Sequence, residues 1–346
     1  MDFPIASILL LDGVTNGAVY ALLGLATVLV FAVTRVVFIP QGEFVAYGAL
    51  TLATLQTGKV PGTVWLLLIL ALACALAELA TRWLRDGQAL AACKAAGATL
   101  VAPLLVAAVT AWAAPQKFPI AVQALLAVAV VTAFGPLIYR IAYQALEDAS
   151  ILVLLIVSVG VNMALTGLGL LFFGAEGFRN PSFWDFAANL GPLRITGDML
   201  IIFASTLLLL VALWLGFGRT LYGKARRATA INRTGARLMG IPTHTAGQLT
   251  FTLAALIGAI SGLLIGPSTT VFYDSGFLIG LKGFVVALMG GLASYPITVA
   301  GALVVGVVES FGSFWASAFK EVIVFTLIIP VLLWLSLKGG HGDAEH

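Results

Sequence analysis

The sequence predicts an all-α fold, a polytopic bundle of transmembrane helices. Three observations predict it: 61% of the 346 residues are hydrophobic, only 10% are charged, and the mean hydropathy is +1.08. A soluble domain has about 25% charged residues, and it could not hide so much apolar surface from water. Disorder requires low hydrophobicity and high charge. The composition therefore excludes a soluble globule and a disordered chain.

Long charge-free runs predict the individual membrane segments. Crossing a bilayer takes roughly 20 predominantly apolar residues. The runs of sufficient length are 13–34, 60–77, 95–116, 118–139, 149–175, 199–218, 238–273 and 283–308. Two shorter runs, 44–58 and 322–337, are also mostly apolar, and we expect 283–308 to be broken at Ser294-Tyr295-Pro296. The prediction is one domain over 1–346 with about 10–11 segments, of which 35–58 is the candidate for a re-entrant or broken helix.

The basic residues predict the orientation. The stretch 218–248 contains six of the 18 basic residues and no acidic one. The positive-inside rule places this stretch in the cytoplasm. Counting crossings from there places the N-terminus and the 176–198 loop outside, and the C-terminus inside. Because the other basic residues follow the topology, the net charge of +3 gives no reason to expect a nucleic-acid partner.

The sequence has no motif for catalysis, metal binding or nucleotide binding. Residues 218–224 match the pattern G-x-x-x-x-G-K, but Ala225 stands where a phosphate-binding loop needs Ser or Thr for magnesium. His244 is alone in the basic stretch, which favours an ordinary polar residue. We therefore expect no cofactor bound by this chain and no enzymatic activity of its own. If ATP drives transport, a partner subunit uses it.

The segment 13–48 contains the first candidate pathway or gating residues. Asn16 lies in an apolar run between Gly13 and Gly17, whose spacing is typical of close helix packing in lipid. Gln41, Gly42 and Glu43 precede another apolar run, which places the Glu43 carboxylate near or in the membrane. Intramembrane carboxylates are costly and usually face the bundle interior or a wet cavity. The alternative for Glu43 is a structural ion pair, for example with Arg35.

Two later segments add further candidates. Gly258, Gly262 and Gly266 form a double G-x-x-x-G, which predicts a helix seam within the bundle or against a second subunit. Lys282 opens a helix on the predicted outer side, where it either belongs to the pathway or extends toward water. The roles of Glu78 and Glu309 do not follow from their spacing.

The basic stretch also predicts a partner contact. Residues 223–239 favour a short helix in which apolar side chains such as Ile231, Leu238 and Met239 alternate with the charges. A solvated loop that only sets topology explains the charges but not the apolar side chains. A cytoplasmic helix seated in a groove of a partner explains both.

Four motif pieces together resemble one family, the permease subunits of bacterial branched-chain amino acid ABC transporters. They are residues 16–22 with 30–31, residues 34–44, residues 221–233 with 236–241, and residues 280–284 with 290–291. The resemblance implies a bacterial inner-membrane permease of an ATP-driven importer. The implied partners are a second related permease, two cytoplasmic ATPase subunits and an extracytoplasmic substrate-binding protein, all meeting at the lipid bilayer.

The resemblance also implies how ATP use reaches this chain. Residues 221–241 match the segment that contacts the ATPase, so they would carry the coupling helix. The implied coupling residues are Tyr222, Gly223, Lys224, Arg226, Arg227, Ala228, Asn232, Arg237, Met239 and Gly240.

Two departures from the family pattern stand out. An apolar hairpin over 60–114 is a probable addition to the family core, and Phe38-Ile39-Pro40 precedes Gln41 where the family commonly has Asn and Ala-Gln. The cargo stays open between apolar amino acids and urea or short amides, which related permeases carry. The other open class is a secondary transporter driven by an ion gradient, for which Glu43, Glu78 and Glu309 would serve.

Overall fold

The computed structural model describes residues 3–86, 89–220, 223, 235, 238–239, 243–331 and 333. Eleven α-helices lie in this described part, which confirms the predicted all-α membrane bundle. They are α1 (Phe3–Thr34), α2 (Gln41–Gln56), α3 (Gly62–Asp86), α4 (Ala89–Ala113), α5 (Ile120–Ile138), α6 (Ile151–Phe173), α7 (Gly197–Arg219), α10 (Thr243–Ile265), α11 (Ser275–Met289), α12 (Tyr295–Trp315) and α13 (Lys320–Thr326).

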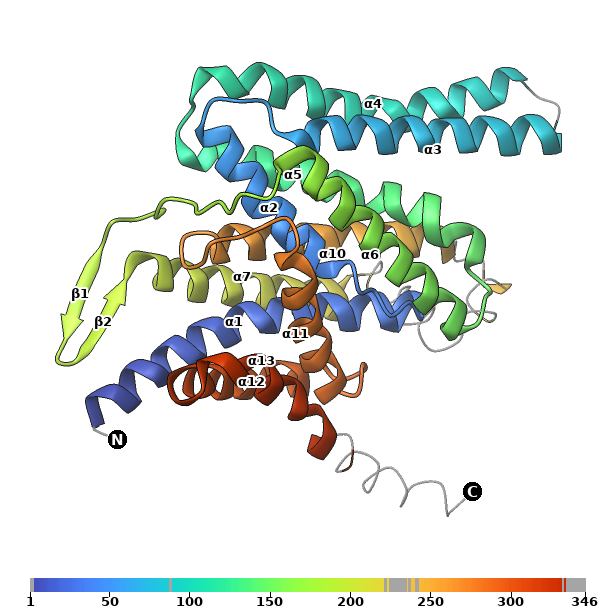
Figure 1. The fold of residues 1–346 in the computed structure, drawn as a ribbon. Helices are drawn as coiled ribbons and strands as arrows, with labels where there is room; N and C mark the ends of the chain where they lie inside the picture. Colours follow the sequence, from blue (N-terminus) through green and yellow to red (C-terminus); the bar gives the residue numbers. More distant parts are fainter. Residues whose placement is uncertain are drawn as a thin grey trace, which may run out of the picture.

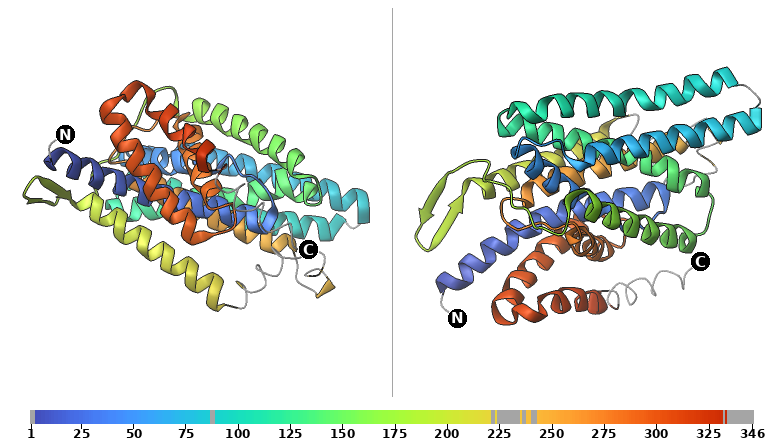
Figure 2. Two further views of the ribbon diagram at one scale, coloured as in Figure 1. Left: turned by 90° about the horizontal axis from the view of Figure 1, so that it is seen from below. Right: turned by 45° about the horizontal axis from the view of Figure 1, so that its top comes forward.

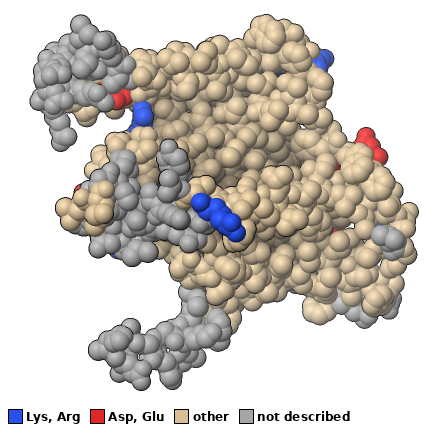
Figure 3. Space-filling model, turned by 180° about the vertical axis from the view of Figure 1, so that it is seen from behind, with Lys and Arg blue, Asp and Glu red and all other residues tan. Residues whose placement is uncertain are grey.

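Eight helices of the described part are long and apolar enough to cross a membrane, whereas α2, α11 and α13 are shorter. Eight and three together agree with the 10–11 segments that the charge-free runs predict. The face seen in Figure 3 carries only scattered charged side chains over its described part, as expected of a surface that meets lipid.

The long helices run between two ends of the molecule, and α1 extends through its centre (Figure 1). Its main neighbours are α12, α10 and α11. The N-terminal end of α1 lies at the same end as a small antiparallel hairpin of β1 (Ala187–Leu190) and β2 (Leu193–Thr196). The opposite end contains the end of α3, the start of α4, the end of α7 and the start of α10. The predicted outer loop and the described ends of the predicted cytoplasmic stretch, residues 218–220 and 243–248, therefore lie at opposite ends of the bundle.

The two short helices α2 and α11 lie inside the bundle. Helix α1 ends at Thr34, Arg35 takes a left-handed backbone conformation with φ 59°, and α2 begins only at Gln41. With 16 residues, α2 is about 24 Å long, less than the roughly 30 Å of a bilayer core. The segment 35–58 is therefore a break followed by a helix too short to cross.

The break predicted within 283–308 is confirmed. Helix α11 ends at Met289, and the chain then turns through Gly291 and Leu292, whose φ angles are +63° and +55°. Helix α12 then begins at Tyr295 with Pro296 in its first turn, where a proline costs no hydrogen bond. Glycine suits the first of these left-handed positions because it has no Cβ.

The predicted apolar hairpin corresponds to α3 and α4, which lie side by side along one flank of the bundle (Figure 1 and the right-hand view of Figure 2). They pack against α5, while large apolar side chains such as Trp65, Leu76 and Leu105 are exposed. Exposure of this kind along two membrane-length helices indicates a face covered by lipid.

Candidate functional site

Glu43 is a fully buried carboxylate in the first turn of α2, a helix that is itself enclosed by α10, α11 and α5. Thr166 of α6 donates a hydrogen bond to its Oε1 at 3.1 Å, and Oε2 has no hydrogen-bond partner among the described residues. Arg35 is exposed at the end of α1 and makes no ion pair with Glu43, so that alternative is wrong. The position excludes a surface role for this carboxylate.

Gly42 allows the first turn of α2 to touch α11. A Cβ at Gly42 would overlap the carbonyl oxygen of Gly276 and would lie 2.7 Å from the Cα of Gly280. In return, a Cβ at Gly276 would lie 2.8 Å from Cδ of Glu43. The beginnings of two short helices therefore meet beside the buried carboxylate, and only glycine permits this approach.

Gln41 faces the other side of α2, toward α10. Its Nε2 donates to the carbonyl oxygen of Ala254 at 2.9 Å, and its Oε1 is buried without a partner in the described structure. Gly258 and Gly262 make room here, because a Cβ at either would strike Phe44 or the backbone of Val45. Both glycines thus lie on the contact between α10 and α2.

Helix α6 contributes polar side chains to this region that sequence reasoning missed. Ser158, Asn162 and Thr166 follow one another at intervals of four residues, which places them on one face of the helix. Asn162 is 1% exposed, and neither side-chain oxygen nor nitrogen has a described partner. Ser158 is hydrogen-bonded to Tyr143 at 3.0 Å. Polar residues at intervals of four in an otherwise apolar run are the sequence signal from which this polar face of α6 could have been predicted.

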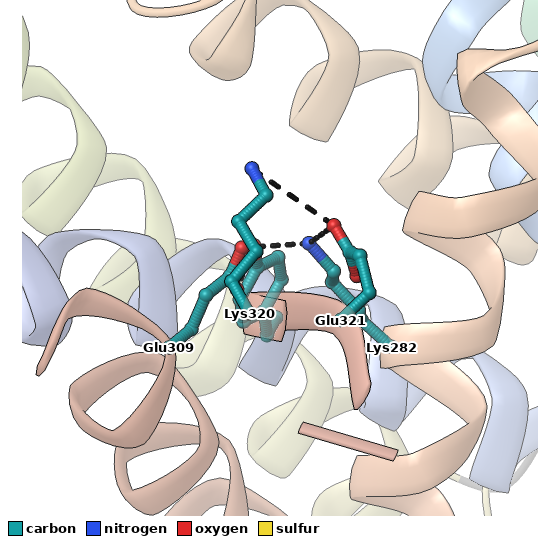
Figure 4. A network of polar contacts seen from close by, with 5 residues as sticks. Lys282, Glu309, Lys320 and Glu321 are labelled. Carbon is teal, nitrogen blue, oxygen red and sulfur yellow. Dashed lines mark hydrogen bonds and ion pairs between the residues drawn. The ribbon is translucent and has the colours of Figure 1, made fainter. Parts of the chain in front are cut away.

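Lys282 is the centre of a second buried polar cluster, shown in Figure 4. Its Nζ lies 2.6 Å from Oε1 of Glu309 in α12 and 3.1 Å from Oε1 of Glu321 in α13. Tyr20 of α1 donates to Oε2 of Glu309 at 2.6 Å. Lys282 is only 5% exposed, so the expectation that it extends toward water is wrong.

This Lys282 cluster joins four helices through balanced charges. Lys320 lies 3.9 Å from Glu321 at its more exposed edge, so two cations face two anions. Buried charges are tolerated when they are paired and hydrogen-bonded. The sequence could not assign Glu309, because its partners lie 27 and 289 residues away. Tyr20 and Glu321 gave no signal of their own.

Asn16 lies apart from both clusters. It is exposed on the outer surface of α1, while Gly13 and Gly17 on the adjoining face pack against α12. A Cβ at Gly13 would lie 2.6 Å from the Cα of Val307, and one at Gly17 would lie 2.9 Å from the Cα of Leu303. The third glycine of the later motif, Gly266, packs against the side chain of Asn180.

Most of the predicted coupling residues fall outside the described residues. These are Tyr222, Lys224, Arg226, Arg227, Ala228, Asn232, Arg237 and Gly240. Gly223 is buried, and its N–H donates to Oγ1 of Thr220 at 3.0 Å. Leu238 and Met239 are 84% and 83% exposed. Two large apolar side chains thus project from the structure near the start of α10.

The two described clusters place charged side chains inside the bundle. Buried groups of both signs lie on short or central helices, and no cluster of three or more His, Cys, Asp or Glu suited to a metal occurs in the part searched.

Comparison with known proteins decides the family. A family model described as "Branched-chain amino acid transport system / permease component" matches residues 89–332, more than half of the chain. The chain belongs to this family. It is therefore a multi-pass membrane protein of the transport permease class, as the motif pieces indicated.

Individual relatives agree with this assignment. The chain is 32% identical over 212 residues to the high-affinity branched-chain amino acid transport permease BraD of Pseudomonas aeruginosa, which covers 59% of this chain and 69% of the relative. It is 31% identical over 214 residues to the corresponding permease LivH of Escherichia coli K12, covering 60% and 70%. The L-arabinose transport permease AraH of E. coli K12 is 30% identical over 129 residues, 34% of this chain and 35% of the relative. No solved structure matches the chain significantly.

Proposed function

We propose that this permease is one membrane-spanning subunit of an ATP-driven importer in the bacterial inner membrane, and that it passes branched-chain or other apolar amino acids. The observation that supports this most is the family match over residues 89–332, together with relatives whose names specify branched-chain amino acid transport. The cargo would be delivered by an extracytoplasmic binding protein and released on the cytoplasmic side.

The energy would come from partner subunits. Two cytoplasmic ATPases would bind the segment 221–241, and a second, related permease would complete the channel. Exposure of Leu238 and Met239 supports a partner at this end, because large apolar side chains projecting together mark interaction surfaces. Closing of the ATPases on ATP would shift the membrane helices from an outward-open to an inward-open arrangement.

The pathway and gating candidates divide into two groups under this proposal. Gln41, Gly42, Glu43 and Lys282 lie on the short helices α2 and α11, inside the subunit. These residues would take part in the change from the outward-open to the inward-open arrangement, because both helices lie among the membrane helices that would move. Asn16 faces outward from α1, where it would line the boundary with the second permease.

The cargo is the part of the proposal that the relatives constrain least. AraH is named for L-arabinose transport, so related permeases differ in what they carry. Urea or a short amide is the alternative cargo, since a binding protein can select the solute before it reaches the membrane.

The test is purification of the tagged chain from its native membrane in a mild detergent, followed by mass spectrometry and reconstitution. Co-purification of a second polytopic protein and soluble ATPases is expected. Liposomes containing this complex should take up leucine only when ATP is present on the ATPase side and the binding protein on the other. A chain that purifies alone and takes up solute on an ion gradient would overturn the importer and favour a secondary transporter. Uptake of urea but not leucine would change the cargo alone.

A further inference from the structure

An apolar groove lies between α7 and the start of α12, beside α1, which packs against both helices (Figure 1). Its volume is about 220 Å³, below the roughly 300–1,000 Å³ that is usual for small-molecule sites. Every lining side chain is aliphatic or aromatic. Leu25 of α1 is buried at the bottom of the groove, whereas Trp214 of α7 and Pro296 of α12 are exposed along it.

The depth of this groove in the membrane follows from where α7 ends. The apolar span of α7 runs over Gly197–Gly216, and the helix ends at Arg219. Leu210 lines the groove and lies about 9 Å before the end of the span, at 1.5 Å per residue. Residues at the ends of spans lie at the level of lipid headgroups, where exposed tryptophans such as Trp214 are common. The groove therefore extends from headgroup level into the hydrocarbon of one leaflet.

Arg219 supplies a cation at the headgroup end of the groove. Its guanidinium carbon lies 5.8 Å from the centre of the Trp214 ring, so the side chain folds back over a wall of the groove. Within the described part of the chain, this guanidinium has no hydrogen bond or ion pair that would occupy its donors. A guanidinium binds phosphate oxygens through paired, charge-assisted hydrogen bonds. A phosphate at this level would therefore find free donors.

The stripe of α7 that carries Trp214 continues as apolar surface toward the middle of the bilayer. Leu207 precedes Trp214 by one heptad, so the two side chains lie about 20° apart around the helix. They are 64% and 65% exposed. An acyl chain that extends from a phosphate at Arg219 would contact this stripe and enter the groove. Free phosphate would use the guanidinium but not the apolar groove.

The sequence next to the groove favours an anionic headgroup. Lys224, Arg226 and Arg227 closely follow Arg219, and the stretch 218–248 contains no acidic residue. Basic residues just outside a membrane span attract anionic lipids, by about fivefold for each residue near the surface. The other candidate occupant is a helix of the second permease, but an apolar helix carries no anion for Arg219.

We propose that this groove binds an anionic phospholipid of the adjacent leaflet, such as phosphatidylglycerol, with one acyl chain between α7 and α12 and the phosphate on Arg219. The lipid would lie where α7 leads into the segment 221–241, so the bilayer would contact the chain beside the segment proposed to bind the ATPases. Lipid binding can be measured whether or not the chain transports amino acids, so this proposal can fail or stand separately from the importer.

The experiment places the photo-crosslinker p-benzoylphenylalanine at Leu210. The full-length chain with its co-purifying subunits is reconstituted in phosphatidylethanolamine with a minority of phosphatidylglycerol, and mass spectrometry identifies the adducts. We expect phosphatidylglycerol adducts about fivefold above its share of the membrane. The matched control is the same crosslinker at Leu208, which is 68% exposed and lies about 160° from Leu210 around α7. Adducts there should follow the bulk lipid composition.

Three charge variants test the role of Arg219. Arg219→Gln should return the adducts at Leu210 to the bulk composition, whereas Arg219→Lys should keep part of the enrichment. Arg194→Gln, which removes an exposed charge at the opposite end of the bundle, should leave the enrichment unchanged. Enrichment that persists in Arg219→Gln would overturn the proposal, as would equal lipid adducts at Leu210 and Leu208.

A further variant tests the groove without touching the cation. Val299 is a half-buried lining residue, so Val299→Trp should fill the groove while Arg219 remains. Native mass spectrometry after delipidation should then find less retained phosphatidylglycerol than in the unchanged chain, and equal retention would contradict an acyl chain in the groove. Adducts between Leu210 and the second permease would also overturn the proposal, because the groove would then be a subunit interface.

Discussion

The Lys282 ammonium lies 2.6 Å from the Glu309 carboxylate, and both side chains are at most one-tenth exposed. Lys282 comes from α11 and Glu309 from α12, and Tyr20 of α1 bonds to the second carboxylate oxygen. Three helices that differ widely in sequence position are therefore joined through one carboxylate. Three changes test what such buried contacts contribute, and a fourth tests the proposed coupling segment.

Removing one charge of this pair should destabilise the bundle. Lys282→Met leaves Glu309 buried without its cation, and breaking a buried pair costs on the order of 3–5 kcal/mol. A lower apparent melting temperature in detergent and less folded protein are expected. The double variant Lys282→Met with Glu309→Met should recover part of the lost stability, since neither position then holds a buried charge without its partner.

Lys320→Met is the control for that series, because Lys320 is 43% exposed and lies 3.9 Å from Glu321. Exposed ion pairs contribute about 0–1 kcal/mol. A double variant as unstable as the sum of its single changes would show that the pair is not coupled.

A single methyl group at Gly42 should disrupt the contact between α2 and α11. The Cβ of alanine would overlap the Gly276 carbonyl oxygen, and backbone atoms on both sides leave no flexible group to yield. We expect Gly42→Ala to reduce the yield of folded protein in fluorescence-detected size-exclusion chromatography. Gly160→Ala on α6 meets nothing within 4 Å and should behave as wild type. Normal folding of both variants would contradict the close approach.

The hydrogen bond from Thr166 should stabilise the buried Glu43 side chain. Thr166→Val keeps the shape but removes the described donor, and an unsatisfied buried polar group costs about 1–3 kcal/mol. Thermal unfolding of the purified complex should shift to lower temperature. Thr166→Ser retains the hydroxyl and should stay close to wild type; an equal loss in both variants would indicate packing instead of the hydrogen bond.

Reversal of two basic charges should separate the permease from its ATPase. We expect Arg226→Glu with Arg227→Glu to abolish co-purification of the ATPase, while the second permease still follows the tag. The same reversal at Arg179 and Arg194 in the predicted outer loop should leave ATPase binding intact. Undiminished ATPase binding in the first variant would remove the coupling segment from the proposal.

Composition and charge spacing predicted most of the architecture, because a bilayer imposes a minimum length on each apolar run. The same reasoning predicted a break at Ser294-Tyr295-Pro296, and the structure has one at residues 290–294, directly before Tyr295 and Pro296 begin α12. It also predicted that Glu43 lies near or in the membrane, since the carboxylate directly precedes an apolar segment.

What the sequence could not predict were the contacts between distant helices. Lys282 was expected either to line the pathway or to reach water, and the deciding partners lie in α12 and α13. Arg35 was a plausible partner for Glu43 because the two residues are near in sequence. In the structure Arg35 has a left-handed backbone conformation and is exposed, whereas Glu43 is buried. Thr166, 123 residues away, takes its place. Helix rotation decides such pairings, and apolar runs without a strong polar face do not fix it.

The enclosure of α2 has a consequence for how the protein is made. The helix that carries Glu43 is covered on two sides by α10 and α11, which the ribosome delivers about two hundred residues later. A helix of 16 residues with a carboxylate in its first turn is a poor candidate for stable insertion by itself. Until α10 and α11 arrive, the nascent chain must hold this segment at the translocon, at the membrane surface or under a chaperone. Completion of α11 is therefore the first moment at which both of these covers of α2 are present.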